Sequence, residues 1–217
     1  DFRILLGSKR PLPATFAEDM IMKAPSGDIM NKLARCVLAS YSYDENPEDR
    51  SAANNLRQCI ELIARFSTFA AYAYEAKRHY HDGKSMYIHN PKPELSTSEN
   101  LLRLIRPAKS YSKLEAETLD LSLILHAEHG GGNNSTLSIH VVSSADTDTY
   151  SAVAAAVGSL KGRRHGGANA QVMDMMDRVK KNVKDWSSEK EVTAYLKKII
   201  RKEAGDRTGL IYGMGHA

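Results

Sequence analysis

Three short stretches of this chain place histidines beside glycines. They are His126-Ala127-Glu128-His129 followed by Gly130-Gly131-Gly132, then His165 between Gly162-Arg163-Arg164 and Gly166-Gly167, and finally Tyr212-Gly213-Met214-Gly215-His216. Glycine weakens helices and is kept where the backbone bends or approaches another group closely. Imidazoles at such bends can donate or accept protons near neutral pH. The pattern predicts a site assembled from the ends of several helices.

A metal centre is the first alternative for clustered histidines. A zinc-protease helix carries His-Glu-x-x-His, whereas here Ala127 separates His126 from Glu128, and His129 follows directly. The zinc deaminases need a downstream Pro-Cys-x-x-Cys, which this sequence does not contain. We therefore expect no metal site.

The first motif predicts a helix end followed by a helix start. His126 and His129 lie three residues apart, so they would share one face at the C-terminal end of a helix. The glycines end that helix, and Asn133 opens the next one, with Ser135 close behind. Amide side chains and free N–H groups at a helix start can bind a carboxylate. The alternative, a capped turn with buried and hydrogen-bonded histidines, is favoured by this motif taken alone.

The second motif places His165 at or just before a helix N-terminus. The helix dipole there favours the neutral imidazole over the imidazolium. A neutral imidazole can donate a hydrogen bond to a developing enolate oxygen. His216 lies in a glycine loop, where backbone can come close to a ligand. A purely structural role stays open for either histidine taken singly.

The elements that must position these residues all read as helices. Apolar residues recur at helical spacing, and no alternating segment longer than four residues indicates a strand. The expected helices cover 1–7, 14–24, 29–41, 50–81, 97–106, 113–128, 147–161, 167–182 and 188–204, and a further helix opens at Asn133. We expect Gly7 to stop the first, Thr97 or Ser98 to cap the fifth and Ser188 to cap the last, while a break near Ser67-Thr68 stays open. The fold class is all-α.

Composition limits the class of protein. The 217 residues suffice for one large domain or two small ones, and the net charge of +4 suits an anionic substrate. The basic residues are scattered, so we expect no nucleic-acid partner. No segment approaches the roughly 20 apolar residues of a membrane-spanning helix, so we expect no membrane partner. Cys36 and Cys59 lie on apolar helical patterns, which predicts buried, reduced thiols.

Together and in order, the three motifs resemble the citrate synthase family. The resemblance rests on the stretches His126 to Ser135, Leu160 to Asn169 and Tyr212 to His216, and the helical pattern agrees along the whole chain. It implies a mostly helical two-domain enzyme, usually a homodimer, with its active site between the domains. The large domain would cover 1–165, and 166–217 would begin the smaller domain.

The resemblance also implies a role for each motif residue. His165 would hydrogen-bond the acetyl-CoA carbonyl and stabilise its enol, and His216 would polarise and protonate the oxaloacetate ketone. His129 and Asn133 would bind substrate, Ser135 and His126 would support the histidines, and Leu210, Ile211 and Gly213 would line the coenzyme A pocket. Acetyl-CoA and oxaloacetate are then the substrates, with no permanently bound cofactor.

The sequence departs from the family pattern in one place, and it corresponds to only part of a full-length family member. Arg163 and Arg164 stand where family members usually have a proline and a small apolar residue. The chain opens inside a helical pattern and stops at Ala217, so we expect an internal piece of a longer protein. The family's aspartate base and its carboxylate-binding arginines would lie beyond it, and we expect this piece alone to be inactive.

Two other functions and the location of the protein remain to be weighed. A 2-methylcitrate synthase would use propionyl-CoA with the same histidines. A non-catalytic helical binding or assembly module is the alternative from another class. We expect a cytoplasmic location of the bacterial type, with organellar targeting left open.

Overall fold

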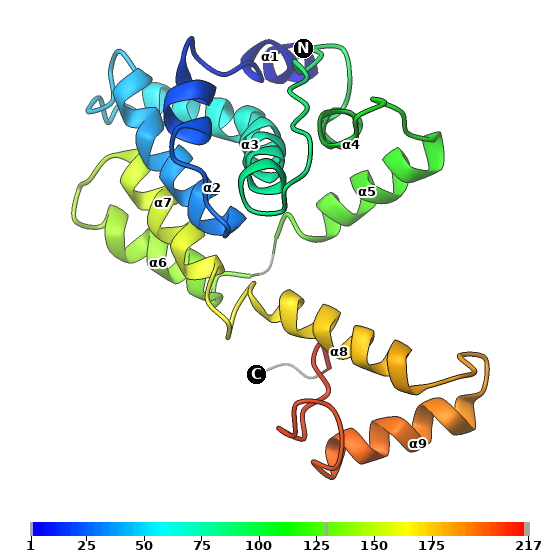
Figure 1. Ribbon diagram of the computed structural model, residues 1–217. Coiled ribbons are helices and arrows are strands. Elements are labelled where there is room, and N and C mark those ends of the chain that lie inside the picture. The colour runs from blue at the N-terminus through cyan, green and yellow to red at the C-terminus, as the bar shows by residue number, and fades with distance from the viewer. Residues whose placement is uncertain (1, 129, 215–217) are drawn as a thin grey trace. The chain divides into compact units, whose positions relative to one another are not determined.

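The computed structural model describes residues 2–128 and 130–214, and within these residues all regular structure is helical (Figure 1). The all-α prediction is confirmed. The α-helices are α1 (Phe2–Lys9), α2 (Ile29–Ala39), α3 (Ala52–Tyr80), α4 (Thr97–Ile105), α5 (Lys113–Leu125), α6 (Asn134–Ser143), α7 (Thr149–Leu160), α8 (Ala168–Asn182) and α9 (Glu189–Ile200). A π-helical turn, η1 (Ala17–Met22), and a 3-10 turn, η2 (Ser40–Tyr43), flank α2.

Short polar side chains begin the helices by accepting backbone N–H groups that have no partner within the helix. Ser96 and Glu99 form a reciprocal capping box at the start of α4, and so do Ser112 and Glu115 at the start of α5. The prediction that Thr97 or Ser98 caps α4 is therefore wrong by one residue. Ser188 caps α9 by accepting the N–H of Glu191, as predicted.

Several predicted helix bounds are corrected by local geometry. The predicted helix 14–24 is only the π-helical turn η1, because Thr15 has a φ of 65° and no helix continues through that conformation. The last helix ends at Ile200 rather than residue 204, since Lys202 has a φ of 63°. The open break near Ser67-Thr68 does not occur, and α3 runs unbroken for 29 residues.

Gly7 does not stop the first helix but lies buried within it. A Cβ built on Gly7 would lie 2.2 Å from the carbonyl oxygen of Pro93, so only glycine allows α1 to approach that segment. Arg10, just after α1, is almost fully buried and donates to the carbonyl oxygens of Lys92, Pro93 and Leu95. These contacts join α1 to a segment more than 80 residues away in the sequence.

The first compact unit, Asp1–Ser159, is built around α3. This helix packs against α1, α2 and α4 (Figure 1). Phe16, Val37, Phe69 and Leu104 are at most 1% exposed in its core, and the rings of Phe16 and Phe69 stack with centroids 5.2 Å apart. Burial of these side chains is the main stabilising contribution to this unit, at about 1.5–3 kcal/mol for each.

The second compact unit, Leu160–Ala217, has its own small core. α8 and α9 pack against each other through Met175, Val179 and Ile199, and Val183 joins them. The units meet between Ser159 and Leu160, whereas the sequence placed the domain boundary after His165. The assignment of large and small domains stays a prediction.

The two cysteines are free thiols, as predicted, but only one is buried. Cys36 lies in the core, and burial raises the pKa of its thiol to about 12. Cys59 is exposed on α3, so the prediction of a buried thiol is confirmed for Cys36 and wrong for Cys59. The apolar pattern around Cys59 belongs to a helix face that the first unit leaves open. None of the helices in the described ranges is long and apolar enough to span a membrane.

A buried carboxylate joins three segments of the first unit. The side chain of Asp44 is 2% exposed and accepts hydrogen bonds from the Tyr150 hydroxyl (2.6 Å), Gln58 Nε2 (2.9 Å), Arg57 Nη2 (2.7 Å) and the Asn46 N–H (3.0 Å). Burial alone raises the pKa of Asp44, but these four donors outweigh it and lower the pKa from 3.8 to about 2. The ionised form is therefore favoured in the folded state.

Replacing Asp44 with Asn is expected to destabilise the protein by about 2 kcal/mol at neutral pH and by less in acid. A pKa that is lower in the folded state contributes stability above the unfolded value near 4. That contribution is lost as the pH falls toward 2. Urea unfolding of Asp44→Asn and the parent from pH 7 to pH 2.5 measures this difference. Glu45→Gln, which changes the exposed neighbouring carboxylate, is the control, and a pH-independent difference between Asp44→Asn and the parent would contradict the assignment.

Candidate active site

The first motif begins where α5 ends. The helix stops at Leu125, so His126 is its C-cap, and the predicted continuation to Glu128 is wrong. His126 is exposed, and its Nδ1 lies 2.7 Å from the carbonyl oxygen of Ser122, one turn back. This contact fixes the ring against its own helix, which neither supports nor excludes the predicted supporting role. His129, predicted to bind substrate, lies outside the described residues.

Asn133 is the N-cap of α6, as its predicted place at a helix start requires. Its side-chain oxygen accepts the N–H of Thr136 (2.9 Å), and its Nδ2 lies 2.7 Å from the Gly130 carbonyl oxygen and 2.8 Å from the Thr136 hydroxyl. Both amide protons are thus used within the turn, and one lone pair on the oxygen remains. In this conformation Asn133 can accept a hydrogen bond from a ligand hydroxyl but has no spare proton for a carboxylate.

Ser135 lies in the first turn of α6 and joins that helix to α7. Its hydroxyl donates to the carbonyl oxygen of Ala156 at 3.1 Å. α7 is rich in small side chains, and this bond links it to its neighbour α6. That Ser135 orients His165 stays a prediction.

The second motif is a tight turn that ends in α8. The N–H of His165 donates to the Gly162 carbonyl oxygen (2.9 Å), and the N–H of Gly167 donates to the same oxygen (3.1 Å). The His165 carbonyl oxygen in turn accepts the N–H of Ala168 (3.1 Å), the first residue of α8. His165 is half-buried and lies three residues before Ala168, the first residue of α8, so its predicted place before a helix N-terminus is confirmed.

The glycines of this turn are required by close backbone approach. A Cβ on Gly166 would lie 2.6 Å from the Leu160 carbonyl oxygen. A Cβ on Gly167 would lie 2.8 Å from the carbonyl oxygens of both Lys161 and Gly162. Contacts this short do not occur in folded proteins, so any side chain here must open the turn that carries His165.

The third motif folds back onto the second unit. Ile211 and Tyr212 pack against its core, while Leu210 is 56% exposed. Gly213 has a φ of 84°, and a Cβ there would also come within 3.2 Å of Val172 on α8. Leu210, Ile211 and Gly213 were predicted to line a coenzyme A pocket. Of these three, Ile211 packs against the core of the second unit. His216 lies outside the described residues.

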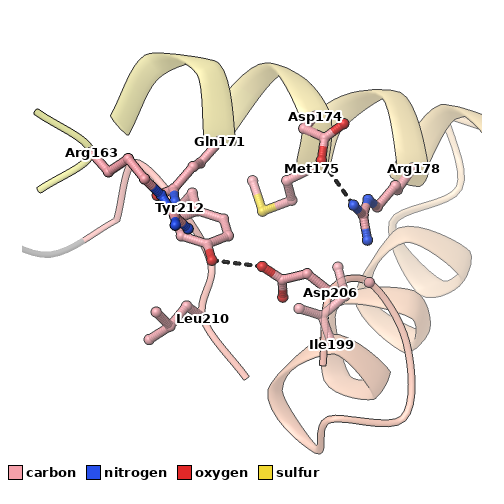
Figure 2. Close-up of a pocket in the computed structure, with 10 residues that line it drawn as sticks. Arg163, Gln171, Asp174, Met175, Arg178, Ile199, Asp206, Leu210 and Tyr212 are labelled. Atoms are coloured by element: carbon pink, nitrogen blue, oxygen red, sulfur yellow. Dashed lines mark hydrogen bonds and ion pairs between the residues drawn. The ribbon is translucent and has the colours of Figure 1, made fainter. Parts of the chain in front are cut away.

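A cavity of about 240 Å³ lies in the second unit, between α8, α9 and the 205–212 loop (Figure 2). It is lined by Arg163, Gln171, Asp174, Met175, Arg178, Ile199, Gly205, Asp206, Leu210 and Tyr212. Leu210 is the predicted pocket residue among them. The cavity brings a residue of the second motif, Arg163, together with Tyr212 of the third motif and with Leu210, which precedes that motif.

Polar bonds hold the wall of this cavity in place. The Tyr212 hydroxyl donates to Asp206 Oδ2 at 2.6 Å, and Thr208 donates to Asp206 Oδ1 through its hydroxyl (2.7 Å) and its N–H (3.0 Å). These hydrogen bonds, that of Tyr212 first, lower the pKa of Asp206 to about 2. Arg178 forms an ion pair with Asp174 at 2.8 Å, one turn apart on α8 (Figure 2).

Most of the residues that line this cavity were not predicted from the sequence. Gln171, Asp174, Met175 and Arg178 recur at intervals of three and four residues, so they share one face of α8. That spacing was visible in the sequence. Whether this face of α8 borders a cavity depends on where the 205–212 loop folds back. The residue spacing within a single helix carries no information about the position of that loop.

The described residues contain no group of three or more His, Cys, Asp or Glu side chains placed to hold a metal ion. His126, Asn133 and Ser135 belong to the first unit. His165, Leu210, Ile211 and Gly213 belong to the second. The predicted site residues are therefore divided between the two units, and the contacts given above are those that each residue makes within its own unit.

A family model described as citrate synthase, C-terminal domain, matches residues 1–217, the whole of this chain. The chain belongs to the citrate synthase family. A citrate synthase of Haloferax volcanii is 36% identical over 86% of this chain and 45% of its own length. A 2-methylcitrate synthase of Mycobacterium tuberculosis H37Rv is 32% identical over 82% of this chain and 40% of its own length.

The solved structures show the same helical fold. A citrate synthase of the thermophilic archaeon Thermoplasma acidophilum superposes with a TM-score of 0.76 at 22% identity, and the match covers 99% of this chain and 51% of that one. The identification of the family from the three histidine motifs is thus confirmed. The chain spans about half the length, or less, of these citrate synthase relatives.

Proposed function

We propose that the intact protein is a citrate synthase that condenses acetyl-CoA with oxaloacetate, the reaction that admits acetyl units to the tricarboxylic acid cycle. The observation that carries this proposal is the family match over the whole chain, which includes all three histidine motifs. The Thermoplasma acidophilum structure is a ternary complex with carboxymethyl coenzyme A and oxaloacetate, which supports a coenzyme A thioester and oxaloacetate as the two substrates here.

The proposed reaction is a Claisen-type condensation. A base removes a proton from the methyl group of acetyl-CoA, and the resulting enol carbon bonds to the keto carbon of oxaloacetate, whose oxygen takes up a proton. Water then cleaves the thioester and releases citrate and CoA. No permanently bound cofactor takes part.

We assign the enol-stabilising role to His165. His165 is half-buried and lies two residues before Gly167, the N-cap of α8, where the helix dipole favours a neutral imidazole that donates a hydrogen bond to the thioester oxygen. His216 would protonate the ketone oxygen, and His129 would bind oxaloacetate. Asn133 would accept a hydrogen bond from the hydroxyl that forms when the ketone oxygen of oxaloacetate is protonated, which suits the one lone pair left on its side-chain oxygen.

The intact protein would be a homodimer. Support comes from the exposure of α5 and α6. Within the ranges of these two helices, Ala116 is the one buried residue. Six of their apolar side chains are each more than half exposed: Leu114, Leu121, Ile124, Leu125, Leu137 and Val141. Exposed apolar surface of this extent is typical of a face that another subunit covers. Sedimentation of the intact protein as a monomer would contradict this part of the proposal.

A second activity is favoured by one observation. The Mycobacterium tuberculosis relative carries the name 2-methylcitrate synthase at an identity close to that of the citrate synthase from Haloferax volcanii. One additional methylene on the acyl group is discriminated only about 10- to 200-fold by an apolar pocket. Both acyl-CoA substrates must therefore be compared directly.

The test is thiol release by the intact protein, with oxaloacetate and either acetyl-CoA or propionyl-CoA. We expect turnover with both and a kcat/KM at least tenfold higher for acetyl-CoA. A preference for propionyl-CoA would assign the 2-methylcitrate reaction, and no thiol release with either would support the non-catalytic module. The 217-residue chain, assayed alone, is expected to show no turnover, because it spans about half of its relatives.

A further inference from the structure

Arg163 brings a positive charge to the cavity of the second unit. It stands two residues before His165, and its side chain extends toward Tyr212 along the cavity wall (Figure 2). An arginine at the edge of a cavity is either neutralised by a carboxylate of the protein or available to an anion from solution. The partners of the other charged groups in this wall distinguish these two cases.

Both carboxylates of the cavity wall are already bonded to other groups. Asp174 forms its ion pair with Arg178 at 2.8 Å, and Asp206 accepts from Tyr212 and twice from Thr208. Arg163 makes no hydrogen bond or ion pair with any residue in the described ranges. Its five N–H donors and its charge are therefore open to a ligand.

The charge of the second unit also favours an anion. Residues 160–217 carry thirteen lysines and arginines against seven aspartates and glutamates, a formal net charge of +6. Residues 1–159 carry seventeen against nineteen, which gives −2 and agrees with +4 for the chain. Positive potential concentrated on one unit raises the local concentration of a polyanionic substrate and its rate of association.

The cavity is too small for a whole coenzyme A molecule. Pockets that enclose a drug-sized ligand measure roughly 300–1,000 Å³, and this one measures about 240 Å³. It fits one end of a long ligand, while the rest extends into solvent or over other parts of the protein. Apolar side chains (Met175, Ile199, Leu210) and polar groups share its wall, so it suits a ligand end that has both an apolar part and polar groups.

We propose that Arg163 binds a phosphate group of the acyl-CoA cosubstrate, and that it is a specificity-determining residue for the nucleotide end of that molecule. The guanidinium fork matches two phosphate oxygens and forms short charge-assisted hydrogen bonds with them. This inference rests on the proposed function for the identity of the ligand. It adds a binding residue that lies outside the catalytic histidines.

The test compares Arg163→Gln with Arg164→Gln in the intact protein. The two substitutions remove the same charge from neighbouring positions in one loop, but Arg164 does not line the cavity. Arg163→Gln should raise the KM for acetyl-CoA about 10- to 100-fold, the range for hydrogen bonds to a charged group. Its kcat should change less than threefold, and both constants of Arg164→Gln should stay within about twofold of the parent.

Acetyl-pantetheine, which lacks the nucleotide and its phosphates, separates phosphate binding from a general disturbance of the loop. Its KM should be the same for the parent and for Arg163→Gln. An equal rise with acetyl-pantetheine and acetyl-CoA, or no rise with acetyl-CoA, would overturn the proposal. Dephospho-CoA, which lacks the 3′-phosphate, tells which phosphate is bound. If Arg163→Gln no longer prefers CoA over dephospho-CoA, Arg163 binds the 3′-phosphate. If the affinities for CoA and dephospho-CoA fall equally in Arg163→Gln, it binds the diphosphate.

Calorimetric titration with CoA provides a readout that does not depend on turnover. We expect CoA binding to weaken 10- to 100-fold in Arg163→Gln, and inorganic phosphate to compete with CoA more effectively in the parent than in the variant. A protein without condensation activity that still shows this difference would refute the proposed function and leave the role of Arg163 standing. Equal CoA affinity in parent and variant would refute the role of Arg163 alone.

Discussion

Replacing His165 with alanine in the intact protein is expected to lower the kcat of the proposed condensation by roughly two to four orders of magnitude. This is the usual range when a polarising or general-acid group is lost. The physical basis is the position of His165, which is half-buried in the turn before α8 and whose backbone is held by two hydrogen bonds. The KM for oxaloacetate should change much less, because the role assigned to His165 concerns the acetyl-CoA carbonyl.

Steady-state thiol release measures this effect, and circular dichroism confirms that the variant is folded. His79→Ala is the matched control, since His79 is exposed at the end of α3 and belongs to none of the three motifs. It should retain the kcat of the parent within about twofold. Near-native turnover in His165→Ala would show that another group stabilises the enol, and the assignment of roles would have to be rebuilt.

Gly167→Ala should lower kcat about 100-fold, although it replaces none of the motif histidines. The new Cβ would meet the carbonyl oxygens of Lys161 and Gly162 at 2.8 Å, and both are backbone atoms that cannot rotate away. Relief requires the turn to open, which displaces His165 by a distance on the order of 1 Å. Displacement of a reacting group by this amount costs about 100-fold in rate.

The control for this substitution is Gly27→Ala in the first unit. A Cβ there meets only the ring of His81 at 3.7 Å or more, an ordinary van der Waals distance, so activity should not change. A double variant tests the mechanism itself. If Gly167→Ala acts through His165, then adding it to His165→Ala should cost almost nothing further, because groups that act as a unit fail together. A further 100-fold loss in the double variant would show that the glycine acts by another route.

The sequence by itself determined the helical class and the family. Apolar spacing and capping residues are local properties, since a helix forms its hydrogen bonds within one segment. The motif histidines could be identified for the same reason, because each lies beside glycines that mark a bend. Even the place of His165 before a helix followed from the order Gly166-Gly167-Ala168, without any knowledge of what packs around it.

The errors in helix bounds came from contacts between distant segments. Gly7 reads as a helix stop, yet the carbonyl of Pro93 lies against it, and that proximity makes glycine necessary inside the helix. Nothing within a few residues of Gly7 carries this information. The exposure of Cys59 is a second error of this kind. The apolar spacing around Cys59 identifies one face of a helix, but it does not tell whether another segment covers that face.

Only the tertiary structure decided which polar groups meet. The buried Asp44 receives its shortest hydrogen bond from Tyr150, more than 100 residues further along the chain, and the cavity joins Arg163 to a loop that begins about 40 residues later. Hydrogen bonds and ion pairs act over a few ångströms, so they depend on which segments packing brings together. The sequence fixes the chemistry of each side chain, and the packing of the helices selects the partners that make Asp44 a buried anion and Arg163 an open cation.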